Sequence, residues 1–257
     1  EEVRTLIYEQ TGNYLDDNLM LLAKKMDMFR DQEKLQEAID KLLKEKVLTQ
    51  EILNIITVPE TRFFREKPQL DVFLNHIIPT IKSCPIRIAS FACATGEEVY
   101  TLAMMLRANS IPHEIIGFDI NESYLEKARQ GMYPIRRLKD IPEEYYEFLD
   151  IKENSFKIRN SLTSKIQFKK LNLIRKEHFA LYQEKFDVAF CRNALIYFDD
   201  NSKLKAVRNI THTIKPNGFF IVSMTEILNK IHIQSFEEIK VEGIFFYKKI
   251  KHFYENS

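Results

Sequence analysis

The chain has 257 residues, enough for one large α/β domain or for a catalytic domain with a small appendage. Hydrophobic residues make up 45% and charged residues 29%, which excludes a disordered chain, and a net charge of +1 gives no reason to expect nucleic acid as a partner. Three widely spaced cysteines without a CxxC pair argue against disulfides and zinc, so we expect no metal and a cytoplasmic location. No apolar run reaches the ~18 residues of a membrane span, so no membrane insertion is expected.

Residues 1–57 show helical periodicity and no strand signal. Apolar residues at three- and four-residue steps predict two helical faces, Leu15, Leu19, Leu22, Met26 and Phe29, then Leu35, Ala38, Ile39, Leu42 and Leu43. A short third helix is predicted over 52–56. We therefore predict a helical domain over 1–57. It contains 8 basic and 12 acidic residues, which give a net charge of −4.

Residues 58–257 alternate between strand and helix signals, which is typical of a parallel sheet with helices on both faces. Strands are predicted over 86–92, 114–118, 186–191 and 219–224, with an antiparallel pair over 236–239 and 244–250. One helix is expected to end at Gly131, and another, over about 201–214, at a turn over 215–218. The alternation breaks over 132–166, where the runs 156–159 and 164–169 suggest short antiparallel strands. We predict that this stretch is an inserted β-subdomain.

The segment Ala-Cys-Ala-Thr-Gly-Glu-Glu at 92–98 directly follows the first predicted strand, and ligands of open α/β sheets bind beyond the carboxyl ends of the strands. It has neither a G-x-G-x-x-G pattern nor a Walker lysine. Its two carboxylates would repel a phosphate but tolerate a cation, such as a sulfonium cofactor. Thr95 and Glu98 also fit a capping box with Thr95 as N-cap, so the spacing leaves capping and ligand contact open.

Two more segments follow predicted strands. Asp119 ends the second strand, where a dinucleotide-type fold places an acid against ribose hydroxyls, although such a residue can also begin a turn or cap a helix. Residues 190–198, FCRNALIYF, lack the Asn-Pro-Pro-Tyr of adenine-N6 chemistry. Tyr197 and Phe198 in this segment are equally compatible with packing in the core.

The segment Thr61-Arg62-Phe63-Phe64-Arg65 lies where the helical region meets the α/β region. Its two phenylalanines are expected to pack. Its two arginines are either solvated or suited to hold a carboxylate, which a guanidinium group binds through two parallel hydrogen bonds.

Together these segments resemble the chemotaxis receptor glutamate O-methyltransferases of the CheR type. The matching stretches run in order along the chain: TRFFRE at 61–66, CATGEEVYTLAM at 93–104, GFDINESYLEKARQGMY at 117–133, LNL at 171–173, FDVAFCRNALIYFD at 186–199 and KPNGFFIVSMTEIL at 215–228. Each stretch alone is weak evidence, whereas the ordered set is specific. The resemblance implies a Rossmann-like sheet of the S-adenosylmethionine (SAM)-dependent methyltransferases, a helical N-terminal domain and an inserted antiparallel β-subdomain, with the boundaries 1–57, 58–257 and about 132–166.

The resemblance also implies which residues bind the cofactor. Glu98 would face SAM, Asp119 would bind its ribose, and Asn172 and Leu173 would flank its adenine.

At the reacting end of the cofactor, Thr61 and Arg65 would line the site, and Arg192 and Asn193 would lie around the sulfonium and methyl group. Arg65 and Tyr197 are the catalytic candidates that the resemblance suggests. Arg65 would offset the cost of desolvating the incoming carboxylate, and Tyr197 would orient the methyl group or the substrate.

The chain departs from the family pattern at several places. Pro59 stands where members often carry Asn, so a polar cofactor contact is lost, and CATGEE replaces the common CSTGEE. The helical domain, which in the family is thought to dock on acidic receptor helices, is acidic here; a basic patch remains at Lys24, Lys25, Arg30 and Lys34, for which solvated helix charges are slightly favoured. Residues 150–156 contain no Gly, unlike the loop of members that bind a receptor tail peptide, so we expect no dependence on such a peptide.

We therefore predict that the protein methylates glutamate side chains on the cytoplasmic domain of chemotaxis receptors, with S-adenosylhomocysteine (SAH) as the second product. A monomer associated with receptor clusters is expected. Two alternatives stay open: a catalytically silent SAM-binding regulator, and a methyltransferase that acts on a small molecule or RNA.

Overall fold

The computed structural model describes residues 2–14, 24, 26–27, 29–226, 228–229 and 234–250. The helices are α1 (Glu2–Thr11), α3 (Gln32–Glu45), α4 (Gln50–Ile56), α5 (Lys67–Val72), α6 (Glu97–Ala108), α7 (Glu122–Gln130), α8 (Asn160–Thr163) and α9 (Asp200–Thr213). Short 3₁₀ or π turns cover Phe73–Ile77, Ile78–Thr80, Ile135–Asp140, Glu143–Phe148, Lys176–Tyr182 and Leu195–Tyr197. The strands are β1 (Ile86–Phe91), β2 (His113–Asp119), β3 (Met132–Pro134), β4 (Leu149–Ile151), β5 (Ser155–Ile158), β6 (Ile166–Lys170), β7 (Phe186–Phe190), β8 (Ile214–Ile221), β9 (Phe236–Val241) and β10 (Ile244–Lys249).

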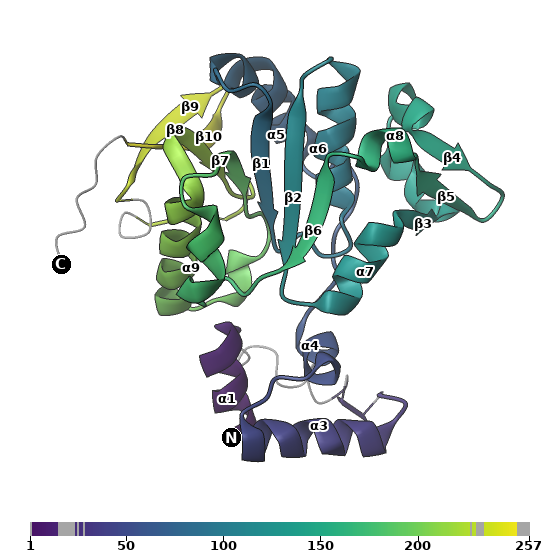
Figure 1. The fold of residues 1–257 in the computed structure, drawn as a ribbon, viewed down its shortest axis with the longest axis vertical. Coiled ribbons are helices and arrows are strands. Elements are labelled where there is room, and N and C mark those ends of the chain that lie inside the picture. The colour runs from purple at the N-terminus through teal and green to yellow at the C-terminus, as the bar shows by residue number, and fades with distance from the viewer. Residues whose placement is uncertain are drawn as a thin grey trace.

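Seven strands form the central sheet, in the order β6-β2-β1-β7-β8-β10-β9 (Figure 1). The first five are parallel, and β10 and β9 close the sheet in antiparallel pairing. Successive side chains of β1 enter different cores: Ile88 packs on the side of α5, α6 and α7, and Ala89 packs on the side of α9. Burial on both faces is typical of a parallel sheet, and the predicted α/β fold class is confirmed.

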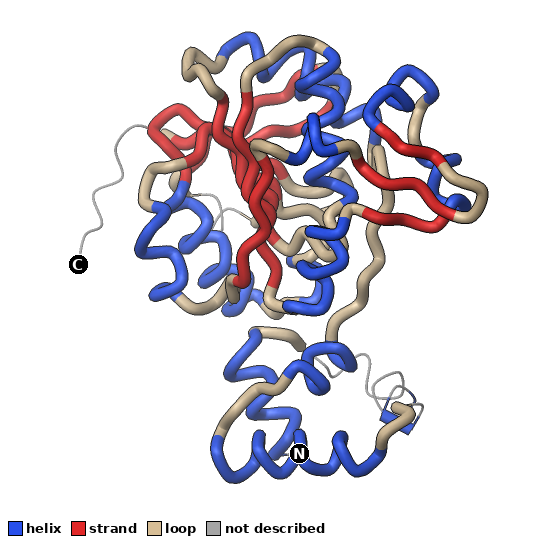
Figure 2. Tube along the Cα trace, turned by 45° about the vertical axis from the view of Figure 1, so that its right-hand side comes forward, coloured by secondary structure: helices blue, strands red, loops and turns tan. Residues whose placement is uncertain are grey.

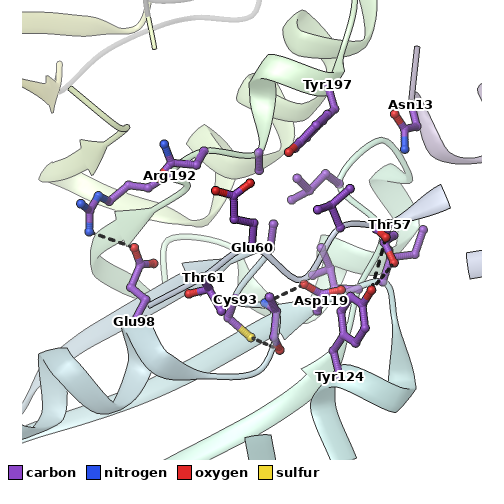
Figure 3. Close-up of a pocket in the computed structure, with 18 of the residues that line it drawn as sticks. Asn13, Thr57, Glu60, Thr61, Cys93, Glu98, Asp119, Tyr124, Arg192 and Tyr197 are labelled. Atoms are coloured by element: carbon purple, nitrogen blue, oxygen red, sulfur yellow. Dashed lines mark hydrogen bonds and ion pairs between the residues drawn. The ribbon is translucent and has the colours of Figure 1, made fainter. Parts of the chain in front are cut away.

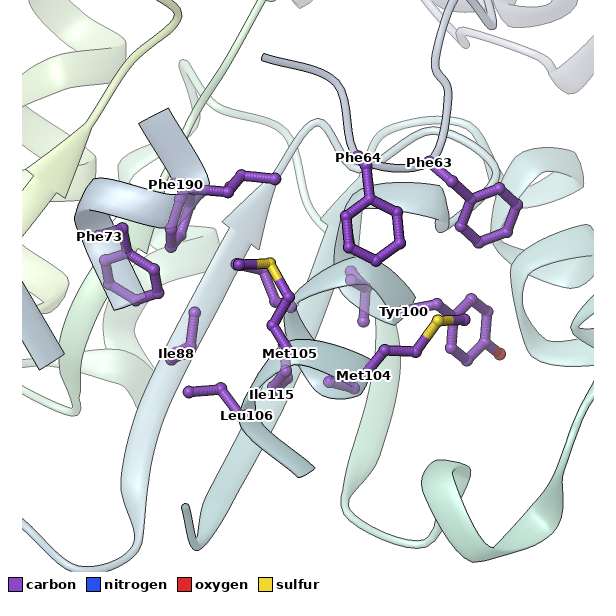
Figure 4. Packing of buried hydrophobic residues seen from close by; sticks show 14 of the residues in the cluster. Phe63, Phe64, Phe73, Ile88, Tyr100, Met104, Met105, Leu106, Ile115 and Phe190 are labelled. Carbon is purple, nitrogen blue, oxygen red and sulfur yellow. The ribbon is translucent and has the colours of Figure 1, made fainter. Parts of the chain in front are cut away.

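The predicted packing of Phe63 and Phe64 is confirmed (Figure 4). The ring of Phe63 meets that of Tyr133 edge-on at 4.9 Å, and the ring of Phe64 lies 4.8 Å from that of Tyr145. Because these contacts bury both rings, they fix the backbone of the segment that carries Arg65.

The inserted stretch forms a small antiparallel sheet in the order β3-β5-β4. The prediction of an antiparallel strand over 164–169 was wrong. Strand β6 covers Ile166–Lys170 and pairs in parallel with β2, as the edge strand of the central sheet. Only one residue of β6, Phe168, is buried, so its sequence lacks the continuous apolar run of an interior parallel strand.

The turn predicted over 215–218 was also wrong. Helix α9 ends at Thr213 and the chain enters β8 at once, with a register irregularity against β7 between Phe186 and Val188. Asn217 adopts a left-handed φ of 63°, and a Cβ atom at Gly218 would come within 2.7 Å of the Asp187 carbonyl oxygen. Asn217 tolerates this backbone angle and Gly218 allows the close approach, at an irregular strand start rather than at a turn.

The N-terminal helices α1, α3 and α4 share a separate core, which contains the predicted face of α3 through Leu35, Ala38 and Leu42. Of the first predicted face, Leu15, Leu19 and Leu22 lie outside the described residues, while Met26 and Phe29 pack partly buried against this core. The helices lie beyond the carboxyl ends of the parallel strands in both views (Figures 1 and 2). No helix in the described part of the chain has the length and apolar character needed to cross a membrane.

Candidate cofactor and active site

A cavity opens between the N-terminal helices and the carboxyl ends of β1, β2, β6 and β7 (Figure 3). It encloses about 1220 Å³, counting open solvent at its mouth. All of the residues that the sequence nominated for the site line this cavity, namely Thr61, Arg65, Glu98, Asp119, Asn172, Leu173, Arg192, Asn193 and Tyr197. The parallel sheet accounts for the residues that follow β1, β2, β6 and β7, because it directs the loops after these strands to the same edge. Thr61 and Arg65 come instead from the segment between α4 and α5.

The loop after β1 does not form the capping box that its spacing suggested. The N-cap of α6 is Gly96, and Thr95 Oγ1 donates to Glu97 Oε2 at 2.7 Å. Glu98 instead accepts a hydrogen bond from Ser90 Oγ at 2.8 Å and forms an ion pair with Arg192. Burial raises the pKa of Glu98, although the Arg192 guanidinium opposes that shift.

Gly96 is required by a close approach and by its backbone angle. Its φ is +91°, and an added Cβ atom would lie 2.8 Å from the Cβ atom of Ala128 in α7. Only glycine lets the loop turn this tightly into helix α6 while α7 packs against it.

Asp119 holds the loops after β1 and β2 together. Its two carboxylate oxygens accept hydrogen bonds from the backbone N–H groups of Ala94 at 2.8 Å and Asn121 at 2.9 Å. The turn-forming role is therefore present, whereas the N-cap of α7 is Asn121. Burial raises the pKa of Asp119 to about 6, against which the backbone hydrogen bonds act.

Asn121, which the sequence gave no reason to select, connects the loop after β2 to helix α4 and the residue that follows it. Its Oδ1 accepts from Gln50 Nε2 at 2.6 Å, and its Nδ2 donates to Asn54 Oδ1 at 3.0 Å and Thr57 Oγ1 at 2.9 Å. Thr57 also donates to the hydroxyl of Tyr124. This network, in which Asn121 itself is fully buried, fixes the end of α4 against the cavity wall.

Asn172 and Leu173 follow β6 and are buried. Asn172 Nδ2 donates to the carbonyl oxygen of Gln10 at 2.6 Å, and its Oδ1 accepts from the backbone N–H of Ile174. Asn172 therefore ties the end of α1 to the cavity as well as lining it.

Arg192 is buried, with 3% of its side chain exposed, and is surrounded by acceptors. It forms ion pairs with Glu66 at 3.0 Å and Glu98 at 3.2 Å, and it donates to the carbonyl oxygen of Arg65 at 2.6 Å. The Nε atom of Arg192 is also buried, and it has no hydrogen-bond partner within the described residues. Two carboxylates thus neutralise this cation, so its charge is already committed to the protein.

Glu66, the last residue of TRFFRE, is a second residue that sequence reasoning missed. It adopts a left-handed φ of 54° and accepts hydrogen bonds from Ser223 Oγ at 2.6 Å and Met224 N at 3.0 Å. Burial alone would raise the pKa of Glu66. The hydrogen bonds and Arg192 together outweigh burial, so the pKa of Glu66 lies below its ordinary value. Its motif position was a signal, but its partners come from loops more than 120 residues away.

Asn193 sits on a loop that a buried acid fixes. Its backbone N–H donates to Glu226 Oε2 at 2.8 Å, and Leu195 N–H donates to Glu226 Oε1 at 2.9 Å. The Asn193 side chain donates to Ser223 Oγ at 2.9 Å. Because Glu226 holds the loop, the following Tyr197 is placed at the cavity wall.

Arg65, Glu60 and Tyr197 lie at the open side of the cavity. Arg65 is half-buried, donates to the Glu60 carbonyl oxygen at 2.9 Å, and forms no ion pair within the described residues. The Glu60 carboxylate and the Tyr197 hydroxyl both point into the cavity (Figure 3). Burial first, and then the Glu60 carboxylate, raise the pKa of Tyr197, which keeps its hydroxyl protonated.

The thiols beside the site are packed in the interior. Cys93 and Cys191 are both buried, and burial raises the pKa of each well above its ordinary value, which keeps both thiols protonated. In the described part of the chain, no group of three His, Cys, Asp or Glu side chains could hold a metal ion.

The family model "CheR methyltransferase, SAM binding domain" matches residues 59–244. The chain belongs to the CheR methyltransferase family. A chemotaxis protein methyltransferase of Campylobacter jejuni is 31% identical over 229 residues, which cover 87% of this chain and 86% of the relative. Another from Borreliella burgdorferi is 32% identical over 194 residues, which cover 69% and 68%.

Membership of the CheR methyltransferase family makes SAM the cofactor of this domain. The cavity residues fit such a ligand. Three carboxylates, Glu60, Glu98 and Asp119, line it and favour a sulfonium cation, while Leu173 supplies apolar surface for a flat ring. The buried Nε of Arg192 is a donor that has no partner among the residues that the structure describes.

Proposed function

We propose that this enzyme transfers the methyl group of SAM to glutamate side chains of a chemotaxis receptor, giving glutamyl methyl esters and SAH. The names of its relatives, chemotaxis protein methyltransferases, support the chemotaxis context. The observation that carries the choice of a carboxylate substrate is the contrast between two arginines in one cavity. Arg192 is neutralised by two acids, whereas Arg65 keeps its charge available at the cavity mouth.

The proposed cofactor contacts follow the loops around the cavity. Asp119 and Glu98 accept from the ribose hydroxyls and the polar groups of SAM, and Asn172 and Leu173 flank the adenine. Asn193 and Thr61 border the methionine end.

The reaction needs no general base. A glutamate side chain with a pKa near ~4.3 is ionised at pH 7, so a lone pair of its oxygen forms the new O–C bond while the C–S bond breaks and the sulfur becomes neutral. The protein therefore has to align oxygen, carbon and sulfur and to hold the reacting atoms about 3–3.5 Å apart.

Arg65 and Tyr197 carry that positioning. The Arg65 guanidinium offsets the cost of removing the incoming carboxylate from water, through charge-assisted hydrogen bonds. The protonated hydroxyl of Tyr197, which points into the cavity, orients the carboxylate or the methyl group. Arg192 acts behind them, because it holds the carbonyl group of Arg65 and the carboxylate of Glu98 in one arrangement.

The test uses SAM labelled in its methyl group and membranes that contain chemotaxis receptors. The proposal predicts label on the receptor that mild base releases as methanol. Base-stable label on RNA or a small molecule would refute glutamate methylation and indicate a different methyltransferase activity. SAM binding without transfer would indicate a silent regulator.

A further inference from the structure

A second, more open hollow adjoins the mouth of the cofactor cavity. Its lining residues are Val58, Pro59, Glu60, Thr61, Arg62, Arg65 and Arg137, and it encloses about 920 Å³, counting open solvent. We call it the arginine groove. Five of these residues also line the cofactor cavity, so the groove and the cavity share one wall.

The three arginines come from separate parts of the sequence. Arg62 and Arg65 belong to the segment that the packing of Phe63 and Phe64 fixes, and Arg137 belongs to the 3₁₀ turn Ile135–Asp140 of the inserted subdomain. Arg137 Nη1 donates to the Thr61 carbonyl oxygen at 2.9 Å. This bond connects the inserted subdomain to the cofactor site and places its guanidinium group beside the mouth.

The charges in the groove are not balanced locally. Within the described residues, none of the three arginines forms an ion pair with a carboxylate, and Arg62 is exposed. Glu60 is the one acid among the lining residues. Glu97 does not line the groove; it is buried and interacts electrostatically with Arg137 and Asp140. The groove therefore presents more positive than negative charge next to the reaction site.

We infer that the arginine groove binds an acidic stretch of the substrate protein that flanks the glutamate to be methylated. This inference rests on the proposed function and identifies the surface through which the substrate docks. Guanidinium groups bind carboxylates in a planar, two-bond geometry, so several of them beside the mouth suit a segment with more than one acidic side chain. The groove contains no aromatic side chain on which a nucleic acid base could stack, which favours a peptide over RNA.

The groove also explains how an enzyme with an acidic N-terminal domain could attract an acidic substrate. That domain has a net charge of −4, and its Lys34 is already paired with Asp31 at 3.6 Å. Attraction for an acidic segment is supplied instead by the TRFFR segment and the inserted subdomain, which lie beside the reaction site.

The test measures binding and catalysis separately. A fluorescent glutamate-rich peptide is titrated with SAH-bound enzyme by anisotropy, and ester formation is measured on a receptor cytoplasmic fragment. Arg62→Gln is expected to weaken peptide binding about three- to fivefold, which is the range of one exposed ion pair, and to reduce its salt dependence. Arg62→Lys should recover part of that loss. Arg137→Gln is expected to weaken binding similarly.

Arg136→Gln is the matched control, because Arg136 is exposed on the same 3₁₀ turn and does not line the groove. The affinity of each variant for SAH reports whether its cofactor site is intact. Equal losses in the Arg136 and Arg62 variants, or equally tight binding of a single-stranded RNA, would overturn the groove as a peptide site. If the enzyme forms esters but Arg62→Gln does not change peptide binding, the proposed function stands and the groove is not the peptide site. If peptide binding depends on Arg62 but no ester forms, the groove is supported as a peptide site and the proposed function is refuted.

Discussion

Arg192 and Glu66 form a buried ion pair, with 3.0 Å between Nη2 and Oε2 and with 3% and 16% of their side chains exposed. The pair joins the loop after β7 to the segment that carries Arg65. The same guanidinium group binds Glu98, so one cation compensates two carboxylates in a place that water scarcely reaches.

Replacing Arg192 is expected to destabilise the fold. Arg192→Met would leave two buried carboxylates without a counterion, which should lower the free energy of unfolding by about 3–5 kcal/mol. Urea denaturation measures this change. Arg159→Met is the control, because it removes an exposed pair with Asp150 and should cost at most about 1 kcal/mol. If the two variants lose similar amounts of unfolding free energy, the buried ion pairs of Arg192 stabilise the fold no more than an exposed pair does.

Arg65→Ala is expected to impair catalysis far more than folding. Arg65 lies at the cavity mouth and donates one hydrogen bond to a carbonyl group, so its loss should change the unfolding free energy by less than about 1.5 kcal/mol. Loss of a charge-assisted contact to the substrate should reduce kcat/KM on the order of 10- to 150-fold. Arg129→Ala, on the surface of α7, serves as the kinetic control. A folded and fully active Arg65→Ala enzyme would refute the assigned role.

Cofactor affinity is expected to depend on pH through Asp119. Its pKa is raised to about 6 by burial, so the carboxylate is protonated below that pH and accepts hydrogen bonds less well. If the ribose binds the ionised form, the Kd for SAH stays constant above pH 7 and rises about tenfold by pH 5. Calorimetric titration across this range measures the effect.

Glu98 also lines the cavity with a raised pKa and shifts affinity in the same direction. Asp119→Asn separates the two acids, because it should bind SAH more weakly at pH 7 and show a flatter profile near pH 6. An unchanged profile in this variant would assign the pH dependence elsewhere.

The inserted subdomain is expected not to bind a receptor tail peptide. Strands β4 and β5 are joined over 152–154 by a turn without Gly, in which the Lys152 backbone N–H donates to the Ser155 carbonyl oxygen at 2.8 Å. Calorimetry with a synthetic tail peptide should show no binding at low micromolar concentration. A clear signal in that range would contradict this expectation.

The sequence predicted those features that depend on neighbours along the chain. The strands β1, β2 and β7 are short apolar runs, the end of α7 is marked by Gly131, and every nominated residue except Thr61 and Arg65 follows a strand. Because parallel strands end at one edge of the sheet, the loops after them had to meet, and the residues were nominated correctly as neighbours.

The contacts of those residues depended on tertiary structure. Glu98 fits a local cap by spacing, yet Ser90 and Arg192 draw its carboxylate away from the helix terminus. Strand β6 was misassigned because this edge strand has a single buried residue, Phe168, and so lacks the continuous apolar run of an interior parallel strand.

The sequence by itself thus determined the α/β fold, the methyltransferase family and the set of residues around the cavity, because these follow from local periodicity and from motifs read in order. Only the tertiary structure decided which arginine has its charge available. Arg65 and Arg192 look equivalent in the sequence, but Arg192 lies within reach of Glu66 and Glu98, and Arg65 faces the open mouth. The charge of a guanidinium group is fixed by its chemistry, whereas its use depends on which carboxylates the fold brings beside it.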